Sequence, residues 1–243
     1  MHIITDIPAT RKEFMNKLLT KRPRYSELDN ELDDYSGSKN TLGYFVQQKT
    51  VNQYTVNLDE PFIEPSYYRG IVQMLMNSTE EDTVIFLLNS PGGALNGLVA
   101  LLEGINMSEA NTLAVIIGEC QSAASIFALH CDQIFVSDNA TMLAHNVSYG
   151  TGGKGSDILS HVQHVSKTSE KLLRKTYEHF LDQQEINEMI NGREIYLDAD
   201  EIKQRLDNRD KILEELEALE QAEADKPMKA PSRSKKTPKT TST

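Results

Sequence analysis

The stretch "TVIFLLNSPGGALNGLVALLEGINMSEANTLAVIIGECQSAASIFALH", residues 83–130, decides the fold. It contains two runs of aliphatic residues, 83–88 and 112–118, and each run is followed by a segment that predicts a helix. Short apolar runs of this kind are typical of parallel strands buried on both faces. Strands that alternate with helices predict a parallel sheet with right-handed crossovers.

The alternation extends on both sides of this stretch. Residues 53–58, "QYTVNL", alternate polar and apolar side chains and predict a strand, and residues 65–78 have helical spacing. Residues 133–136, "QIFV", and 141–145, "TMLAH", are short strand candidates. The predicted fold class is therefore α/β, in which functional residues tend to lie in loops at the carboxyl ends of strands.

The parts of the chain differ in composition. We expect a folded domain over residues 41–206, preceded by an N-terminal extension, 1–40, that is partly disordered, and followed by an acidic helix over 207–225. Residues 226–243 are rich in Lys, Pro, Ser and Thr without an acidic residue and predict a disordered basic tail. A long helix is predicted over 156–181, with Ser156 as its N-cap. We expect part of this helix to pack on another subunit.

Charge and cysteine content exclude several classes of protein. The formal net charge of −11 argues against a general nucleic-acid or anionic-membrane binder. Cys120 and Cys131 have no CxxC or Cys/His spacing, so neither a disulfide framework nor a metal site is expected. The N-terminus has no signal-peptide pattern, and no apolar run reaches membrane-spanning length. These features favour a soluble, cytoplasmic protein without a cofactor.

Three short motifs carry candidate chemistry. "NSPGGA", residues 89–94, follows a buried strand and can point backbone N–H groups outward, although a tight turn alone would also explain it. Ser122 lies at a strand-to-helix turn, where it is either a nucleophile or an N-cap. His145 ends a strand, where a histidine is often structural, and beside a serine it becomes a candidate general base.

Together, "NSPGGA", "GECQSAAS" and "MLAHN" resemble the Clp protease proteolytic subunit family, ClpP, and most closely its bacteriophage head maturation relatives. The resemblance runs from about Tyr54 to Leu206 and implies a ClpP/crotonase-type β-α-β spiral with a long protruding handle helix. In the family the nucleophile stands four residues after the signature glycine, here Gly118. That register implies Ser122 as the nucleophile rather than Ser125.

The resemblance also implies a mechanism. Ser122 would attack a peptide carbonyl, with His145 as general base and the N–H groups of Gly93 and Ala123 as oxyanion hole. The family's third triad member aligns with Glu194, before the segment "IYLDADEI", and Asp198 is the alternative. Glutamate stands where ClpP has aspartate.

The resemblance implies a peptide or protein substrate and a homo-oligomeric ring, a heptamer or stacked heptamers. Capsid or scaffold proteins are possible substrates in head maturation. Residues 1–50 do not resemble the family's axial-loop segment, which argues against docking to an ATP-driven unfoldase. Asn146 and Val147 follow His145 without the proline common in the family, and Cys120 and Gln121 replace two alanines.

Two other functions stay open. A crotonase-type acyl-CoA enzyme would share the spiral and hold a thioester oxyanion with backbone N–H groups, without needing the triad. A catalytically inactive assembly protein would keep the fold alone.

Overall fold

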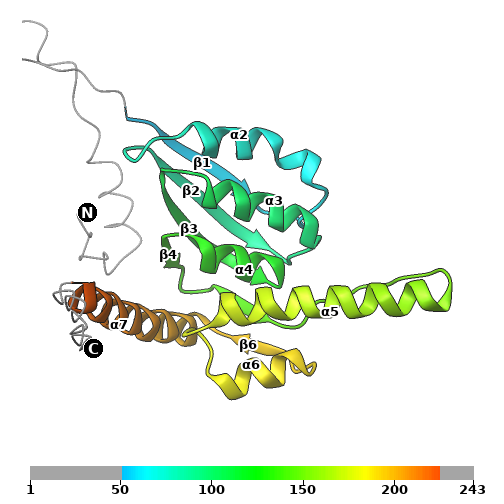
Figure 1. Ribbon diagram of the computed structural model, residues 1–243. Helices are drawn as coiled ribbons and strands as arrows, with labels where there is room; N and C mark the ends of the chain where they lie inside the picture. Colours follow the sequence, from blue (N-terminus) through cyan, green and yellow to red (C-terminus); the bar gives the residue numbers. More distant parts are fainter. Residues whose placement is uncertain (1–50, 225–243) are drawn as a thin grey trace, which may run out of the picture. The chain divides into compact units, whose positions relative to one another are not determined.

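The computed structural model describes residues 51–224, which divide after Ala140 into two compact units. The N-terminal unit comprises residues 51–140 and the C-terminal unit comprises residues 141–224; Figure 1 labels most of their elements. The predicted N-terminal extension, residues 1–40, and the predicted basic tail, residues 226–243, lie outside the described residues.

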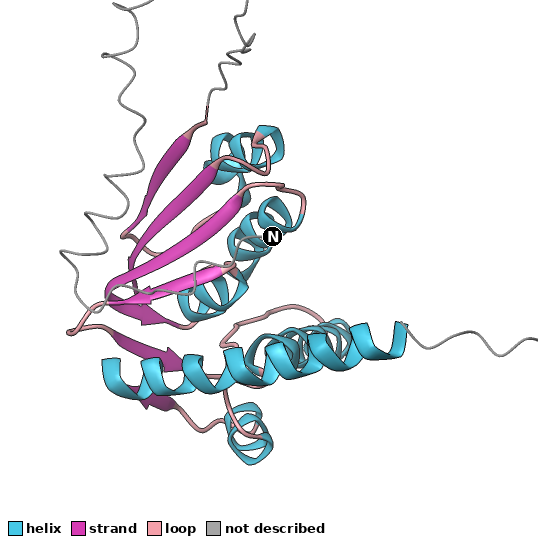
Figure 2. Cartoon of the chain, turned by 90° about the vertical axis from the view of Figure 1, so that its left-hand side faces the viewer, coloured by secondary structure: helices cyan, strands magenta, loops and turns pink. Residues whose placement is uncertain are grey.

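The N-terminal unit is built on parallel strands, as the alternation of strands and helices predicts. The strands are β1 (Gln53–Leu58), β2 (Thr83–Ser90), β3 (Asn111–Gln121) and β4 (Gln133–Val136), and β1–β2, β2–β3 and β3–β4 all pair in parallel. The connecting helices lie on one face of this sheet (Figure 2): η1 (Pro65–Tyr68), α2 (Arg69–Asn77), α3 (Leu95–Asn106) and α4 (Ala123–His130).

The core of the N-terminal unit lies between the sheet and these helices. Val84, Phe86 and Leu88 alternate along β2 and have no exposed surface. The ring of Phe86 meets Phe127 of α4 edge to face, with 4.8 Å between the ring centroids. Burying each such side chain contributes about 1.5–3 kcal/mol. Because side chains alternate across a strand, Ile85 faces the opposite side, in a cluster with Leu113 and Val115.

The C-terminal unit combines one antiparallel strand pair with three helices. Its elements are β5 (Thr141–Ala144), α5 (Gly155–Tyr177), α6 (Gln183–Ile190), β6 (Ile195–Leu197) and α7 (Ala199–Ala224). β5 and β6 pair with Met142 opposite Leu197, Leu143 opposite Tyr196 and Ala144 opposite Ile195. The described chain is thus mixed α/β and rich in parallel strands.

The predicted long helix is present as α5, with corrected ends. Its N-cap is Lys154 and not Ser156, which lies inside the first turn. The helix ends at Tyr177 because His179 adopts a left-handed φ of 66°, and a bridge between Glu178 and Leu181 turns the chain. Leu173 and Tyr177 in its second half are fully buried.

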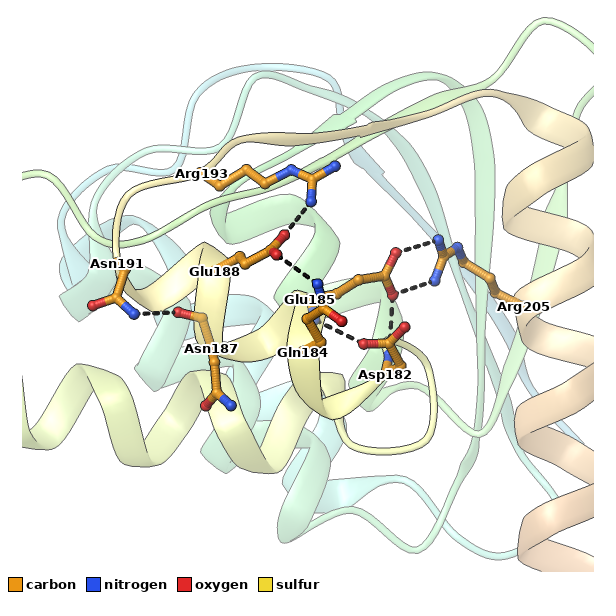
Figure 3. Close-up of polar contacts among 8 residues, drawn as sticks. All are labelled: Asp182, Gln184, Glu185, Asn187, Glu188, Asn191, Arg193 and Arg205. Atoms are coloured by element: carbon orange, nitrogen blue, oxygen red, sulfur yellow. Dashed lines mark hydrogen bonds and ion pairs between the residues drawn. The ribbon is translucent and has the colours of Figure 1, made fainter.

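Helix α6 was not anticipated from the sequence. Its N-terminus is a capping box, in which Asp182 accepts from Glu185 N and the Glu185 carboxylate accepts from Asp182 N. Arg205 of α7 donates to both Glu185 oxygens at 2.7 and 2.8 Å (Figure 3). This bidentate pair joins α6 to α7. Helix α7 runs without a break across the expected boundary between residues 206 and 207.

Candidate active site

Ser122 occupies a strained turn between β3 and α4. Its backbone has φ 55° and ψ −120°, a conformation that costs a non-glycine residue about 1–3 kcal/mol and that clusters at functional sites. Its side chain is half-buried and makes no capping hydrogen bond to α4. A serine that served only as N-cap would accept from an N–H of the first turn, which Ser122 does not.

Ser125 lies one helical turn further and is placed differently. The residue has no exposed surface, and its Oγ donates to the carbonyl oxygen of Ser122 at 2.7 Å. Its hydroxyl is therefore used to stabilise the first turn of α4. Of the two serines, only Ser122 retains side-chain exposure.

The glycine-rich loop "NSPGGA" packs directly on the Ser122 turn. Gly92 has a φ of +90°, and a Cβ there would lie 2.5 Å from Gln121 O and 2.6 Å from Ser122 Cβ. Only glycine allows both this conformation and this approach. Phe62 anchors the other side of the loop, because its N–H donates to Gly92 O and its carbonyl accepts from Ala94 N, each at 2.7 Å.

The N–H groups of Gly93 and Ala123 are available to an anion. Within residues 51–224, neither group donates to a protein acceptor. In the parallel bridge between Phe62 and Gly93, the hydrogen bonds use Gly92 O and Ala94 N, which directs the Gly93 N–H away from Phe62. Ala123 begins α4, whose first N–H groups carry partial positive charge. The two donors can stabilise a negative charge that develops next to Ser122.

An irregularity in the sheet sets the position of the Ser122 turn. Leu88 pairs with Ile116, but Ser90 pairs with Cys120, so β3 has a bulge around Gly118. The Asn89 side chain fills this bulge, where its Oδ1 accepts from Glu119 N at 3.0 Å. A Cβ on Gly118 would lie 2.4 Å from that oxygen, which explains the glycine. Bulges of this kind are enriched next to active sites.

The two cysteines do not compete with Ser122 as nucleophiles. Cys120 and Cys131 are free thiols, 0% and 5% exposed. Burial raises the pKa of both thiols well above the ordinary value. Both are therefore neutral at physiological pH, and neutral buried thiols are inert.

His145 and Glu194 both belong to the C-terminal unit, at the ends of paired strands. His145 directly follows β5 and is half-buried, and Glu194 directly precedes β6 and is exposed. The ladder ends with Ala144 opposite Ile195, so His145 and Glu194 are the next residues beyond this end of the β5–β6 pair. The Glu194 carboxylate accepts from Tyr196 Oη at 2.7 Å, and this carboxylate raises the pKa of Tyr196.

Asp198, the alternative acid, has a different task. Its Oδ1 accepts from the N–H groups of Asp200 and Glu201, at 3.0 and 2.9 Å, and so caps α7. In the same register it stands opposite Thr141, at the far end of β5 from His145. The geometry favours Glu194 over Asp198 as a partner of His145.

An ion pair and a backbone hydrogen bond connect the turn that leads to Glu194 with helix α6. Arg193 forms an ion pair with Glu188 of α6 and donates its backbone N–H to Glu188 O at 3.0 Å (Figure 3). A hydrogen bond from Gln184 and the pair with Arg193 lower the pKa of Glu188. This pair closes the turn after α6.

The expected site residues therefore fall into two sets. Ser122, Gly93 and Ala123 belong to the N-terminal unit, where Gly92 lies against the Ser122 turn, and His145 and Glu194 belong to the C-terminal unit. Within residues 51–224, no group of His, Cys, Asp or Glu side chains is arranged to hold a metal ion. Nor does any helix in that range combine the length and apolar character needed to cross a membrane.

Comparison with known proteins agrees with this geometry. Residues 38–205 match the Clp protease family. The chain belongs to the Clp protease family. It is similar to ATP-dependent Clp protease proteolytic subunit 1 of Chlamydia caviae, with 24% identity over 69% of this chain and 91% of the relative. The corresponding subunit of Streptomyces coelicolor is 25% identical over 67% of this chain and 76% of the relative.

Some contributing residues were not singled out from the sequence. Asn89 lies inside the quoted motif "NSPGGA", so its position was available, but its contact with Glu119 N depends on the bulge. Arg193 directly precedes Glu194, and Tyr196 follows it by two residues. Their contacts, of Arg193 with Glu188 and of Tyr196 with Glu194, form only when the turn is folded. The capping box of α6 had a readable signal, Asp182 followed three residues later by Glu185.

Proposed function

We propose that this chain is a serine endopeptidase that hydrolyses peptide bonds with Ser122 as nucleophile. The observation that carries the proposal is the strained Ser122 turn beside the N–H groups of Gly93 and Ala123, which donate to no acceptor within residues 51–224. Membership of the Clp protease family supports the same chemistry.

In the proposed mechanism, Ser122 Oγ attacks the scissile carbonyl and His145 takes the hydroxyl proton. The Gly93 and Ala123 N–H groups bind the oxyanion, and loss of one such donor costs about 10²–10³ in rate. His145 then returns the proton to the leaving amine. Glu194 holds the imidazole in the tautomer that accepts from Ser122 and stabilises the imidazolium. Water and His145 release the acyl group by the reverse steps.

Assembly and biological role belong to the same proposal. Leu159 of α5 is 59% exposed, which supports an oligomeric ring in which this helix, as the family's handle, meets another subunit. We propose a cytoplasmic protease for bacteriophage head maturation, with capsid or scaffold proteins as substrates. The sequence motifs support this role. Cleavage of unfolded casein without ATP or an unfoldase is the expected behaviour, and strict dependence on ATP would contradict it.

The experiment that tests the catalytic proposal is fluorophosphonate labelling followed by peptide mass mapping. The reagent reacts with serines that a general base activates, so we expect one adduct, on Ser122, that is lost in His145→Ala. Ser125→Ala is the matched control and should label like the wild type. An adduct on Ser125 would overturn the assignment of the nucleophile. A folded, oligomeric protein without adduct would favour the inactive assembly protein or the acyl-CoA enzyme.

A further inference from the structure

Asn146, the residue after His145, joins the segment that carries His145 to the turn that carries Glu194. Its Nδ2 donates to the carbonyl oxygen of Ile190, the last residue of α6, at 2.6 Å, and its Oδ1 accepts from Val147 N at 2.8 Å. The side chain is half-buried. The Asn146 side chain therefore holds the backbone of its own loop and also connects that loop to the end of α6.

The bond to Ile190 completes the end of α6. The last four carbonyls of a helix have no partner inside it. In α6, Asn187 O accepts from Asn191 N, Glu188 O from Arg193 N, and Met189 O from Gly192 N. These three acceptors are satisfied by the residues that directly follow the helix. The fourth, Ile190 O, accepts from Asn146, which is 44 residues away in the sequence.

The proposed acid–base pair, His145 and Glu194, lies between this bond and the end of the β5–β6 ladder. On one side stands the last pair of the β5–β6 ladder, Ala144 opposite Ile195. On the other side stands the bond from Asn146 to Ile190. His145 lies between these two attachments on the segment that follows β5. Glu194 lies between them on the segment that joins α6 to β6. The chain segments on both sides of the pair are therefore held.

We propose that Asn146 is a positioning residue that keeps His145 and Glu194 in register for catalysis. This inference rests on the proposed function. Asn146 itself touches neither substrate nor the reacting atoms in this mechanism. Without its side chain, the segment after β5 loses its hydrogen bond to the end of α6, and the turn from Ile190 to Glu194 is linked to β5 only through the β5–β6 ladder among these contacts. The resulting shift of His145 should slow proton transfer while leaving peptide binding unchanged.

Two variants separate the bonds of Asn146, and a third provides a matched control. Asn146→Ala removes both bonds, whereas Asn146→Asp keeps the acceptor for Val147 N and replaces the donor to Ile190 O by an oxygen. Asn191→Ala removes a similar amide-to-carbonyl bond at the same helix end, from Asn191 Nδ2 to Asn187 O at 2.8 Å. That bond does not reach β5.

The test measures kcat and KM on a peptide and the rate of fluorophosphonate labelling at Ser122, with thermal melting to select folded variants. We expect Asn146→Ala and Asn146→Asp to lower kcat and the labelling rate about 10- to 100-fold, as small misplacements of catalytic groups do, with KM within about twofold. Asn191→Ala should retain wild-type kcat.

Several results would overturn the positioning role. They are a wild-type kcat in folded Asn146→Ala or Asn146→Asp, and an equal loss of kcat in Asn191→Ala. Failure of the proposed function has a different signature, because Ser122 would then take no label in the unmodified protein. A labelled Ser122 that is indifferent to Asn146 overturns only the role of Asn146.

Discussion

At the scale of single residues, the backbone of Ser122 differs from that of an ordinary helix cap. A capping serine has an extended backbone and accepts from the first turn of its helix. Ser122 instead has φ 55° and leaves its hydroxyl unused for capping. Such strain persists only where surrounding contacts enforce it, and here Gly92 and the first turn of α4 supply those contacts.

Ser125→Ala tests whether Ser125 has a structural role and Ser122 the reactive one. The substitution removes the hydrogen bond from Ser125 Oγ to Ser122 O, so we expect a loss of about 0.5–1.5 kcal/mol in the free energy of unfolding. Ser122 should still react with a fluorophosphonate. Denaturant unfolding and mass mapping measure the two quantities. Complete loss of labelling in a stable Ser125→Ala protein would show that Ser125 has a chemical role.

Gly92→Ala tests the close approach of the glycine-rich loop. The new Cβ would meet Gln121 O and Ser122 Cβ at distances below 3 Å, in a backbone conformation that alanine rarely adopts. We expect a strongly lowered melting temperature and no labelling. Gly70→Ala is the control: this glycine lies inside α2, a Cβ added there would have no atom within 4 Å, and alanine should stabilise the helix by about 0.5–1 kcal/mol. Normal labelling of Gly92→Ala would contradict the argument.

At the scale of secondary-structure elements, the Glu185–Arg205 pair couples α6 to α7. Both side chains are about three-quarters buried, at 21% and 26% exposed, and the pair is bidentate. Arg205 holds the pKa of Glu185 below its ordinary value. A carboxyl group with a lowered pKa in the folded state stabilises the fold above its ordinary pKa, and that contribution is lost as the pH falls through the lowered value.

Glu185→Gln should therefore reveal a pH-dependent contribution. We expect the wild type to melt at a higher temperature than Glu185→Gln near neutral pH. The difference should shrink as the pH is lowered below the ordinary glutamate pKa and through the lowered pKa of the folded state, where the Glu185 carboxylate takes up its proton. Thermal melting across this range measures it, and Glu217→Gln makes the same chemical change at an exposed position of α7. A difference that stays constant with pH would contradict the coupling.

At the scale of the whole molecule, α5 changes character along its length. Its second half contributes the fully buried Leu173 and Tyr177 to the C-terminal unit, whereas Leu159 in its first half is 59% exposed. Ile158, Val162 and Val165 lie near Leu159 on α5 and are half-buried. In the proposed ring, we expect a second copy of the chain to cover Leu159.

Leu159→Glu tests this association. We expect the wild type to sediment as an oligomer at micromolar concentration and Leu159→Glu to shift toward smaller species, because a charge would be buried without a partner. Ser160→Glu places the same charge at the adjacent, exposed position of α5 and should assemble normally. A monomeric wild type, or equal effects of the two substitutions, would contradict the expected role of α5.

The sequence predicted β1 to β5, their parallel order in the N-terminal unit and the existence of α5, because strand and helix periodicities are local properties of a chain. It missed α6, although the Asp182–Glu185 signal was readable. It also misplaced the N-cap of α5, since an available Ser156 was preferred over Lys154. Helix ends depend on a few weak contacts, so their exact positions are the least reliable part of a prediction from sequence.

The sequence by itself determined the α/β class, the family motifs and the two candidate serines. Only the tertiary structure decided how those serines differ, because the φ of Ser122 and the burial of Ser125 follow from contacts with Gly92 and with the core. The same holds for Glu194 and Asp198. Their spacing in the sequence leaves both open, whereas in the structure Asp198 caps α7 and Glu194 lies, like His145, just beyond the end of the β5–β6 ladder. Register and burial arise from residues far apart in the chain, which no local pattern encodes.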